Sequence, residues 1–259
     1  PLYELYKYNK YEKSAKKKLF FTSNPKHYYK DNDTTYPKEI NNTNGIVDQI
    51  KKLINGNYSI LYIASDPNNY EKIDSYSHIL FEALKLSNIT FSNYLILDNR
   101  TKDKASEYIS KANVIFLSGG DTFIENKFFE EIKLKELLYN YDGIIIGQSA
   151  GSINMADDVY NSPEEGDNSE PIYFKGLGLS NINIEPHFVL DTKDFDEMQL
   201  YQRNHIINES KKRTIYALCD GSHILEVGGT ITVYGKSYLI KDGLIKEICD
   251  EGKSFCIKN

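Results

Sequence analysis

Five short apolar runs, each bounded by polar residues, constrain the fold of this chain more than any other feature. They lie at residues 19–21, 59–64, 94–97, 114–117 and 143–146. Continuous apolar runs of this length are typical of strands that are buried on both faces of a sheet. Between them, apolar residues recur at helical spacing, at about 45–55, 76–87, 103–111 and 124–139. Strands that alternate with helices predict an α/β fold with a doubly wound, mostly parallel sheet.

The last third of the chain has a different pattern. A strand predicted over 214–218 is followed by short apolar segments at 224–227, 231–235, 237–240 and 244–248. The pairs Gly228-Gly229 and Asp242-Gly243 are typical hairpin turns between such strands. These features predict a C-terminal β meander. Because no linker divides the chain, we expect an N-terminal surface tail over residues 1–17 and a single α/β domain over residues 18–259.

The composition disfavours several classes of function. The formal net charge is −6 and the isoelectric point is about 5.5, so no global positive field attracts nucleic acid or an anionic membrane. No run approaches the roughly 20 apolar residues of a membrane-spanning helix. The three cysteines, Cys219, Cys249 and Cys256, lack the spacing of zinc ligands. We therefore expect reduced thiols, no metal or other cofactor and a cytoplasmic location.

The segment Gly147-Gln148-Ser149-Ala150-Gly151 directly follows the apolar run at 143–146. A sharp turn from strand to helix presents its central side chain at the end of the sheet and points the next backbone N–H groups at an incoming carbonyl oxygen. Such a turn needs small neighbours because its centre is crowded and strained. The segment predicts that Ser149 is a nucleophile. The alternative is a glycine-rich turn whose serine caps the following helix.

A second glycine turn, Ser118-Gly119-Gly120-Asp121-Thr122, follows the run at 114–117. It also lies at the carboxyl end of a predicted strand, where open α/β sheets bind their ligands. The Gly120 N–H is a candidate for one half of an oxyanion hole, with the N–H of Ala150 as the other half. Phosphate binding is the alternative, but the Walker lysine and a full G-x-G-x-x-G are both absent.

A nucleophilic serine requires a base, and the candidates are the five histidines His27, His78, His187, His205 and His223. The first lies in a polar segment and the second within a predicted helix, so both are interpreted as surface or packing residues. His187 follows an apolar run and a proline at a predicted strand end, which favours it as the base. His223 is the alternative.

Together these motifs resemble the dipeptidase E and cyanophycinase family of serine peptidases. The matching pieces are Phe-Leu-Ser-Gly-Gly-Asp-Thr-Phe at 116–123, Gly-Gln-Ser-Ala-Gly-Ser at 147–152, Glu-Pro-His-Phe at 185–188, Arg-Asn-His-Ile at 203–206 and Ala-Leu-Cys-Asp-Gly at 217–221. Their order and spacing agree over roughly residues 18–240. The resemblance implies a flavodoxin-like fold similar to the class I glutamine amidotransferases, with serine in place of cysteine at the nucleophile turn.

The same resemblance implies Ser149 as nucleophile and His187 as general base. The third member of the triad falls in the segment 217–221, which indicates Asp220 where a glutamate is more familiar. The alternative is an acidic residue in the loop after the nucleophile turn, Glu164 or Glu165. Aspartate is one methylene shorter than glutamate, so His187 must lie closer to the backbone at Asp220.

For the substrate, the resemblance is closest to the branch that cleaves after an N-terminal aspartate in short peptides. It implies that Arg203 binds the aspartyl carboxylate, because a guanidinium can grip a carboxylate with two parallel hydrogen bonds. The alternative is an exposed arginine on a helix. Asp121 stands where these dipeptidases more often have asparagine, so it would either repel an acidic side chain or bind the free α-amino group. Thr122, where cyanophycinases usually have glutamine, favours the dipeptidase branch.

The sequence thus predicts a serine exopeptidase that hydrolyses short acidic peptides without a cofactor, as a monomer or homodimer. The alternatives are a cyanophycinase-like hydrolase of β-aspartyl peptides and a non-hydrolytic relative that binds a ligand. An α/β-hydrolase carboxylesterase is disfavoured, because in that fold the acid precedes the histidine, whereas Asp220 follows His187. With Glu164 or Glu165 as the acid, this distinction would vanish.

Overall fold

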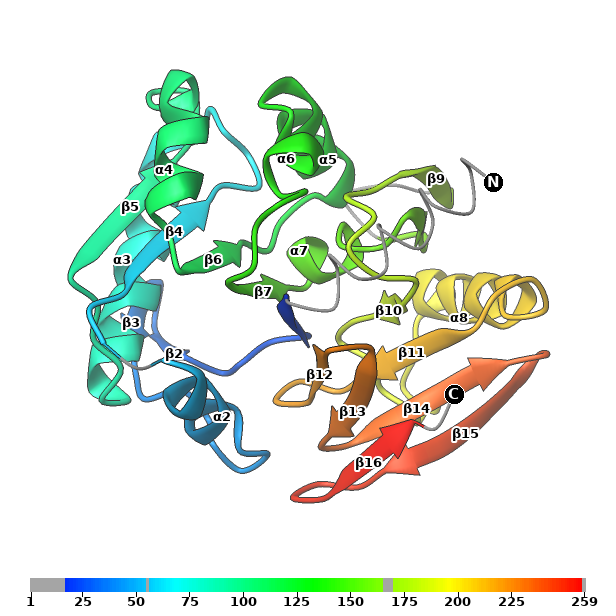
Figure 1. Cartoon of the computed structure of the whole chain (residues 1–259). Helices are drawn as coiled ribbons and strands as arrows, with labels where there is room; N and C mark the ends of the chain where they lie inside the picture. The colour runs from blue at the N-terminus through cyan, green and yellow to red at the C-terminus, as the bar shows by residue number, and fades with distance from the viewer. Residues whose placement is uncertain (1–16, 55, 165–169, 258–259) are drawn as a thin grey trace.

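A central sheet of eight strands organises the computed structural model, which describes residues 17–54, 56–164 and 170–257 (Figure 1). Its strand order is β16-β13-β12-β1-β7-β6-β4-β5. The last five strands of this order are parallel. They are β1 (Lys18–Thr22), β7 (Ile144–Gln148), β6 (Val114–Leu117), β4 (Ser59–Ile63) and β5 (Asn93–Leu97). Each of the five apolar runs forms one of these strands, so the predicted doubly wound α/β fold is confirmed.

Helices cover both faces of the parallel strands (Figure 1). On one face, α2 (Ile46–Leu53) and α3 (Tyr70–Leu86) pack against a core that includes Phe20 and Phe116. On the other face lie η1 (Lys102–Lys104), α4 (Ala105–Lys111), α5 (Thr122–Glu131) and α6 (Leu134–Leu137). The helix predicted over 124–139 is two helices, because Lys133 between them adopts a left-handed backbone with φ of 53°. This layering leaves the carboxyl ends of β6 and β7 accessible.

The predicted C-terminal strands all form, but they are shared between two sheets. β12 (His223–Val227), β13 (Thr230–Tyr234) and β16 (Ser254–Ile257) extend the central sheet in antiparallel fashion. β14 (Ser237–Lys241) and β15 (Leu244–Cys249) join β11 (Ile215–Leu218) and β10 (Asn183–Glu185) in a second sheet. The meander is therefore split into two hairpins. The chain leaves the central sheet at Gly235, whose φ of 86° suits glycine.

Several elements had no counterpart in the sequence prediction. They are the hairpin of β2 (Tyr28–Asp31) and β3 (Thr34–Pro37), the hairpin of β8 (Asp158–Asn161) and β9 (Ile172–Lys175), and strand β16. The helix expected after the nucleophile turn is α7 (Ala150–Ile153), and Arg203 lies on helix α8 (Glu197–Glu209). A capping box at Asp196 and Gln199 begins α8. This helix and the β2–β3 hairpin both contribute residues to cavities beside the nucleophile turn.

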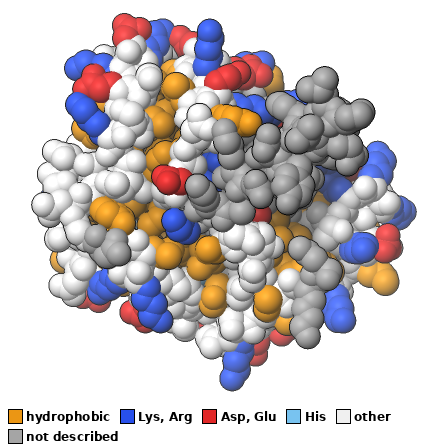
Figure 2. Space-filling view, viewed as in Figure 1, with side chains coloured by type: hydrophobic (Ala, Val, Ile, Leu, Met, Phe, Trp, Pro, Cys, Tyr) orange, Lys and Arg blue, Asp and Glu red, His pale blue; other side chains and the backbone are white. Residues whose placement is uncertain are grey.

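The surface tail expected over residues 1–17 lies outside the described residues except for Lys17. That residue is buried, and its Nζ donates to the carbonyl of Tyr139 at 3.4 Å, so the tail prediction is wrong at this position. Basic and acidic side chains are interspersed over the face shown in Figure 2. Within the described part of the chain, no helix is both long and apolar enough to span a membrane.

Candidate active site

Ser149 stands on a strained turn between β7 and α7. Its φ of 49° and ψ of −110° are rare for a residue with a side chain, and such strain concentrates at functional sites. The surrounding backbone holds this conformation, because the Ser149 N–H donates to the carbonyl of Thr22 at 3.0 Å and the Ser149 carbonyl accepts from Ser152 N–H at 2.9 Å. The half-buried serine is thereby presented at the carboxyl end of the parallel sheet.

The glycines around Ser149 are required by close backbone approach. A Cβ on Gly147 would lie 2.6 Å from the nitrogen of Ser152, and one on Gly151 would lie 2.3 Å from the carbonyl oxygen of Leu117. The crowding expected at this turn is therefore present. Ser152 fastens the first turn of α7 to β1, since its hydroxyl donates to the carbonyl of Thr22 at 2.8 Å and accepts from its N–H at 2.9 Å.

A chain of hydrogen bonds connects Ser149 to His187 and Asp220. The Ser149 Oγ lies 3.1 Å from His187 Nε2, and His187 Nδ1 lies 2.8 Å from Asp220 Oδ1. His187 follows β10 and Asp220 follows β11, two parallel neighbours in the second sheet. The serine thus comes from the central sheet and its two partners come from the second sheet. This is the geometry of a nucleophile, a base and an orienting acid.

Ser23, which the sequence analysis missed, joins this chain of hydrogen bonds from the end of β1. Its fully buried hydroxyl donates to Asp220 Oδ1 at 2.7 Å and accepts from the backbone N–H of His187 at 2.7 Å. One side chain therefore positions both partners of the serine. Nothing in the local sequence distinguishes Ser23 from other serines. The available signal was its place directly after an apolar strand, where polar residues of an open sheet meet ligands.

The electrostatics suit proton transfer to His187. The hydrogen bond to Asp220 raises the pKa of His187 above its ordinary value, against the opposing effect of burial. Burial alone would raise the pKa of Asp220, but the hydrogen bonds from His187 and Ser23 outweigh it and hold that pKa below its ordinary value. Asp220 is therefore ionised at neutral pH. It accepts the Nδ1 proton of His187, which leaves Nε2 as an acceptor for the Ser149 hydroxyl.

The structure does not bring His223, the alternative base, to Ser149. His223 is buried on β12, where its Nε2 lies 2.7 Å from Gln49 Oε1 and its ring stacks on Tyr234. Burial lowers the pKa of His223 to about 3. Among the alternative acids, Glu164 lines a cavity beside His187, and Glu165 lies outside the described residues.

Gly120 and Ala150 present backbone N–H groups beside Ser149. Neither N–H donates a hydrogen bond to another described residue. Gly120 lines the cavities on both sides of Ser149, and the Ser65 hydroxyl donates to the carbonyl of Gly119 at 2.8 Å, which holds this loop in place. Two free donors next to a nucleophile are what an oxyanion hole requires.

Replacing Gly120 by alanine tests this arrangement. The new Cβ would lie 2.3 Å from the Ser65 Oγ, so the loop must shift and move the Gly120 N–H. Loss of one oxyanion donor lowers kcat by roughly 10²–10³-fold, and we expect a decrease of this size in peptide hydrolysis. The φ of 157° at Gly120 is also one that residues with a side chain rarely adopt, so alanine is strained at this position as well. An unchanged kcat in Gly120→Ala would exclude the Gly120 N–H from the oxyanion hole.

Two cavities flank Ser149, and Ser149, His187 and Gly120 line both of them. One, of about 300 Å³, lies between α7 and α8, and we call it the α8 cavity. The other, of about 230 Å³, lies beside α3, and we call it the α3 cavity. The nucleophile is therefore at the junction of two spaces. The two cavities can accommodate the parts of a substrate on either side of the scissile bond.

The α8 cavity carries the acidic side chains Glu164, Glu185 and Asp196. Glu185 is buried, and its Oε1 accepts a hydrogen bond of 2.8 Å from the Ser162 hydroxyl. Burial raises the pKa of Glu185 to about 8. At neutral pH this carboxyl group is protonated and can donate a hydrogen bond, while the exposed Glu164 and Asp196 keep the cavity mouth negative.

The three predicted substrate-binding residues differ in their placement. Thr122 lines the α8 cavity. The Asp121 carboxylate caps α5 by accepting from the N–H groups of Phe123 and Ile124 at 2.9 and 2.8 Å. Arg203 is buried rather than exposed on α8, which excludes the alternative of a solvated arginine.

The Arg203 guanidinium organises the loop that follows His187. It donates to the carbonyl of Leu190 at 3.3 Å and also to the carbonyl of Val189. It stacks over the rings of Phe188 and Phe195 at 4.3 and 5.2 Å. Arg203 does not appear among the residues that line the α8 cavity. To bind a substrate carboxylate, the guanidinium would have to release these carbonyls.

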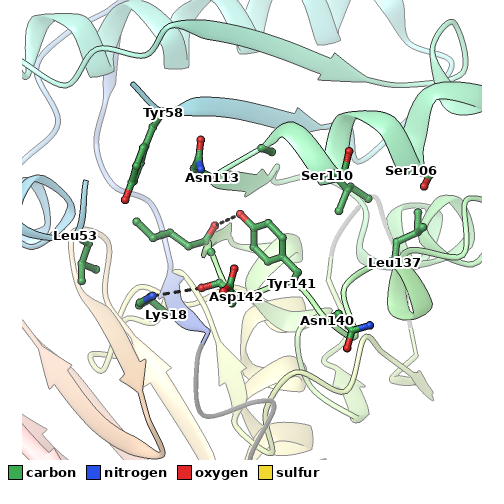
Figure 3. Close-up of a pocket in the computed structure, with 14 residues that line it drawn as sticks. Lys18, Leu53, Tyr58, Ser106, Ser110, Asn113, Leu137, Asn140, Tyr141 and Asp142 are labelled. Carbon is green, nitrogen blue, oxygen red and sulfur yellow. Dashed lines mark hydrogen bonds between the residues drawn. The ribbon is translucent and has the colours of Figure 1, made fainter. Parts of the chain in front are cut away.

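A third cavity, of about 570 Å³ and larger than the other two, is shown in Figure 3. It is lined by residues at the amino ends of the parallel strands, including Lys18, Asn113 and Ile144. Ligands of open α/β sheets bind at the carboxyl ends, so size does not identify the site here. The described residues contain no group of three or more His, Cys, Asp or Glu side chains that could hold a metal ion.

A serine on a strained turn at the carboxyl end of a parallel sheet indicates a serine hydrolase whose fold is a doubly wound α/β sheet. Residues 34–234 match the model of peptidase family S51, and the chain belongs to this family of serine peptidases. The resemblance to the dipeptidase E family is thereby confirmed, as is the prediction that the protein is a serine-type peptidase. The comparison with curated proteins gave no match.

Two solved structures share the fold. A peptidase from an acI-B1 actinobacterium is similar with a TM-score of 0.65 and 14% identity, over 93% of this chain and 96% of that chain. A candidate peptidase E from Listeria monocytogenes EGD-e is similar with a TM-score of 0.57 and 16% identity, over 83% of this chain and 96% of that chain. At these identities the likeness concerns the fold alone.

Proposed function

We propose that this peptidase is an exopeptidase that hydrolyses short peptides with an N-terminal aspartate through an acyl-enzyme on Ser149. The observation that carries the proposal is the hydrogen-bonded chain from Ser149 through His187 to Asp220, at the junction of two cavities of different charge. The family supports peptide hydrolysis as the reaction. The position of the acidic side chains supports the preference for the amino end of a peptide.

In this proposal, His187 Nε2 takes the proton of Ser149 as its Oγ attacks the scissile carbonyl. The N–H groups of Gly120 and Ala150 bind the resulting oxyanion, and one such donor typically contributes about 3–4 kcal/mol to transition-state stabilisation. His187 then donates the proton to the leaving amine, while Asp220 orients the ring and stabilises its charged form. Water, activated by His187, releases the aspartyl group from Ser149.

The α8 cavity has groups for both charges of an N-terminal aspartate. Its negative mouth at Glu164 and Asp196 favours the α-ammonium group. Deeper in, protonated Glu185 can donate a hydrogen bond to the aspartyl carboxylate, because its pKa of about 8 keeps it neutral at pH 7. In this arrangement Glu185 can recognise the aspartyl side chain while Arg203 keeps its contacts with the loop.

A second candidate substrate has a positive side chain next to the scissile bond, as in β-aspartyl-arginine peptides. The observation that favours it is the excess of acidic over basic residues around the α8 cavity. An arginine side chain at the cavity mouth would then replace the α-ammonium group as the partner of Glu164 and Asp196.

Release of chromophore from aspartyl, leucyl and arginyl anilides separates these candidates. We expect the aspartyl anilide to be the fastest substrate of the wild-type protein, with Glu185 and the cavity mouth binding its two charges. N-acetylation of the aspartyl anilide should lower kcat/KM by roughly tenfold or more, since the charged amino group is lost. Hydrolysis of a polymer of β-linked aspartyl-arginine units, followed by release of the β-aspartyl-arginine dipeptide, completes the panel.

The outcomes are distinct. Faster hydrolysis of the arginyl anilide or of the β-linked polymer would favour the second candidate substrate over one with an N-terminal aspartate. Equal rates for free and acetylated aspartyl anilides would show that the protein is not an exopeptidase. The absence of turnover on every member of the panel, with no labelling of Ser149 by a fluorophosphonate, would overturn the proposed reaction itself.

A further inference from the structure

We propose that the α3 cavity is the subsite for the leaving residue of the peptide, and that Lys72 binds the free α-carboxylate of that residue. The inference rests on the proposed function, because it places the amino side of the scissile bond in the α8 cavity. It identifies a further specificity-determining residue, in an element distant from the nucleophile turn. It also defines the orientation of the peptide across Ser149.

The first support is the charge of the α3 cavity. Lys72 contributes an exposed ammonium group from the first turn of α3, and no described acidic residue lines this cavity. Among the described residues, the ammonium group makes no ion pair, and its one aromatic neighbour is the ring of Tyr76 at 5.8 Å. Asp66 and Lys72 both line a small adjoining cavity, but they form no ion pair. The free cation is therefore available to an anionic ligand.

The contrast with the α8 cavity orients a peptide. A dipeptide has one positive and one negative end, on opposite sides of its single peptide bond. The acidic residues lie on one side of Ser149, and the unpaired Lys72 lies on the other. Complementary potentials of this kind fix the register of a charged ligand. The amino end therefore occupies the α8 cavity, and the carboxyl end occupies the α3 cavity.

A second, independent observation comes from His27, which also lines the α3 cavity. Its side chain is buried, and its Nδ1 has no hydrogen-bond partner among the described residues. Burial, with a contribution from the charge of Lys38, lowers the pKa of His27 to about 4, so the ring is neutral at pH 7. A buried polar group without a partner is costly. Because this atom is enclosed, the His27 ring would have to rotate before a peptide group in the cavity could bond to it.

The remaining walls fit the body of an amino-acid residue. The rings of Tyr28, Tyr62 and Tyr76 line the cavity together with Leu80 and Phe116. The amino terminus of α3, capped by Asn69, adds its partial positive charge near Lys72. Aromatic walls with one cation at the rim suit a residue that carries a single carboxylate. A longer peptide would place an uncharged amide at this point instead.

The test compares a free carboxylate with an amide at the same position. The substrates are Asp-Ala, Asp-Ala amide and aspartyl anilide, hydrolysed by the wild-type protein and by Lys72→Gln. If leucyl or arginyl anilide proves faster, the matching alanyl dipeptide pair is used. Lys246→Gln, an exposed lysine on β15, is the control for the loss of one positive charge.

We expect Lys72→Gln to lower kcat/KM for Asp-Ala by roughly tenfold, since a charge-assisted contact is lost. The amide and the anilide have no α-carboxylate, so their kcat/KM should change less than twofold. Wild-type protein should accordingly prefer Asp-Ala to its amide, and Lys72→Gln should lose that preference.

Two failures can be told apart. Suppose that wild-type protein hydrolyses the anilide, but that Lys72→Gln changes kcat/KM for Asp-Ala and Asp-Ala amide equally or changes neither. The assignment of Lys72 is then wrong while the proposed reaction stands. If no substrate is hydrolysed, the proposed function fails first. A loss of preference in Lys246→Gln of the same size would attribute the effect to net charge instead of Lys72.

Discussion

Ser149→Ala is expected to lower kcat for peptide hydrolysis by roughly 10⁵–10⁶-fold, because the nucleophile of the reaction is lost. The Ser149 Oγ is the one hydroxyl that lies within hydrogen-bond distance of His187 Nε2, at 3.1 Å, in the described part of the chain. Without it there is no acyl-enzyme, and only the oxyanion donors and substrate binding remain. Turnover of the preferred anilide measures the effect, and fluorophosphonate labelling should disappear with it.

Ser152→Ala is the matched control for this substitution. Ser152 lies three residues away and is fully buried, but its hydroxyl bonds to the backbone of Thr22 and not to His187. Its loss should cost about 1–3 kcal/mol of stability, because the buried Thr22 N–H loses its partner, and should leave fluorophosphonate labelling intact. Wild-type turnover by Ser149→Ala would show that another residue is the nucleophile.

Asp220→Asn is expected to lower kcat by roughly 10⁴-fold, the size of effect known for removing the acid of a serine triad. Asparagine keeps the shape of the side chain and can still accept from Ser23, but it cannot hold the Nδ1 proton of His187 as a carboxylate does. The wrong ring nitrogen then carries the proton. Anilide turnover measures kcat, and circular dichroism establishes that the variant is folded.

The pH dependence gives this substitution a second readout. His187 must be neutral to act as a base, so kcat/KM rises with pH through the His187 pKa, which lies above its ordinary value of 6.5 because of Asp220. In Asp220→Asn the main cause of that rise is absent, so the acidic limb should move to lower pH. Asp242→Asn, in an exposed hairpin turn, is the control and should leave the limb in place. An unmoved limb in Asp220→Asn would indicate a different acid, such as Glu164.

Most of the central sheet could be predicted because its signals are local. Each parallel strand is apolar throughout, since it is buried on both faces, and that property is visible in a few consecutive residues. The nucleophile turn is local as well, because Gly147 and Gly151 must be glycine for the backbone to approach Ser152 and Leu117. The β2–β3 hairpin was missed because its residues are mostly exposed and its apolar pattern is weak.

The site residues that contact distant parts of the chain were harder to predict. Ser23 lies 164 residues from His187 and 197 from Asp220, and a serine alone carries no sign of such contacts. Arg203 was predicted to bind the substrate, but in the structure its guanidinium donates to the carbonyls of Val189 and Leu190 and holds that loop. Its role in substrate binding stays a prediction. Asp121 similarly caps α5, a role that its position after two glycines did not indicate.

The doubly wound sheet, the serine turn and the family could be derived from the sequence, because each depends on short segments and on their order along the chain. Which side chains meet at the site depends on the tertiary structure. The second sheet brings the ends of β10 and β11 to the end of β7, which places His187 and Asp220 at Ser149, whereas His223 in β12 contacts Gln49 instead. Strand patterns fix which residues are buried, but the meeting of two sheets depends on long-range packing, which no local pattern contains.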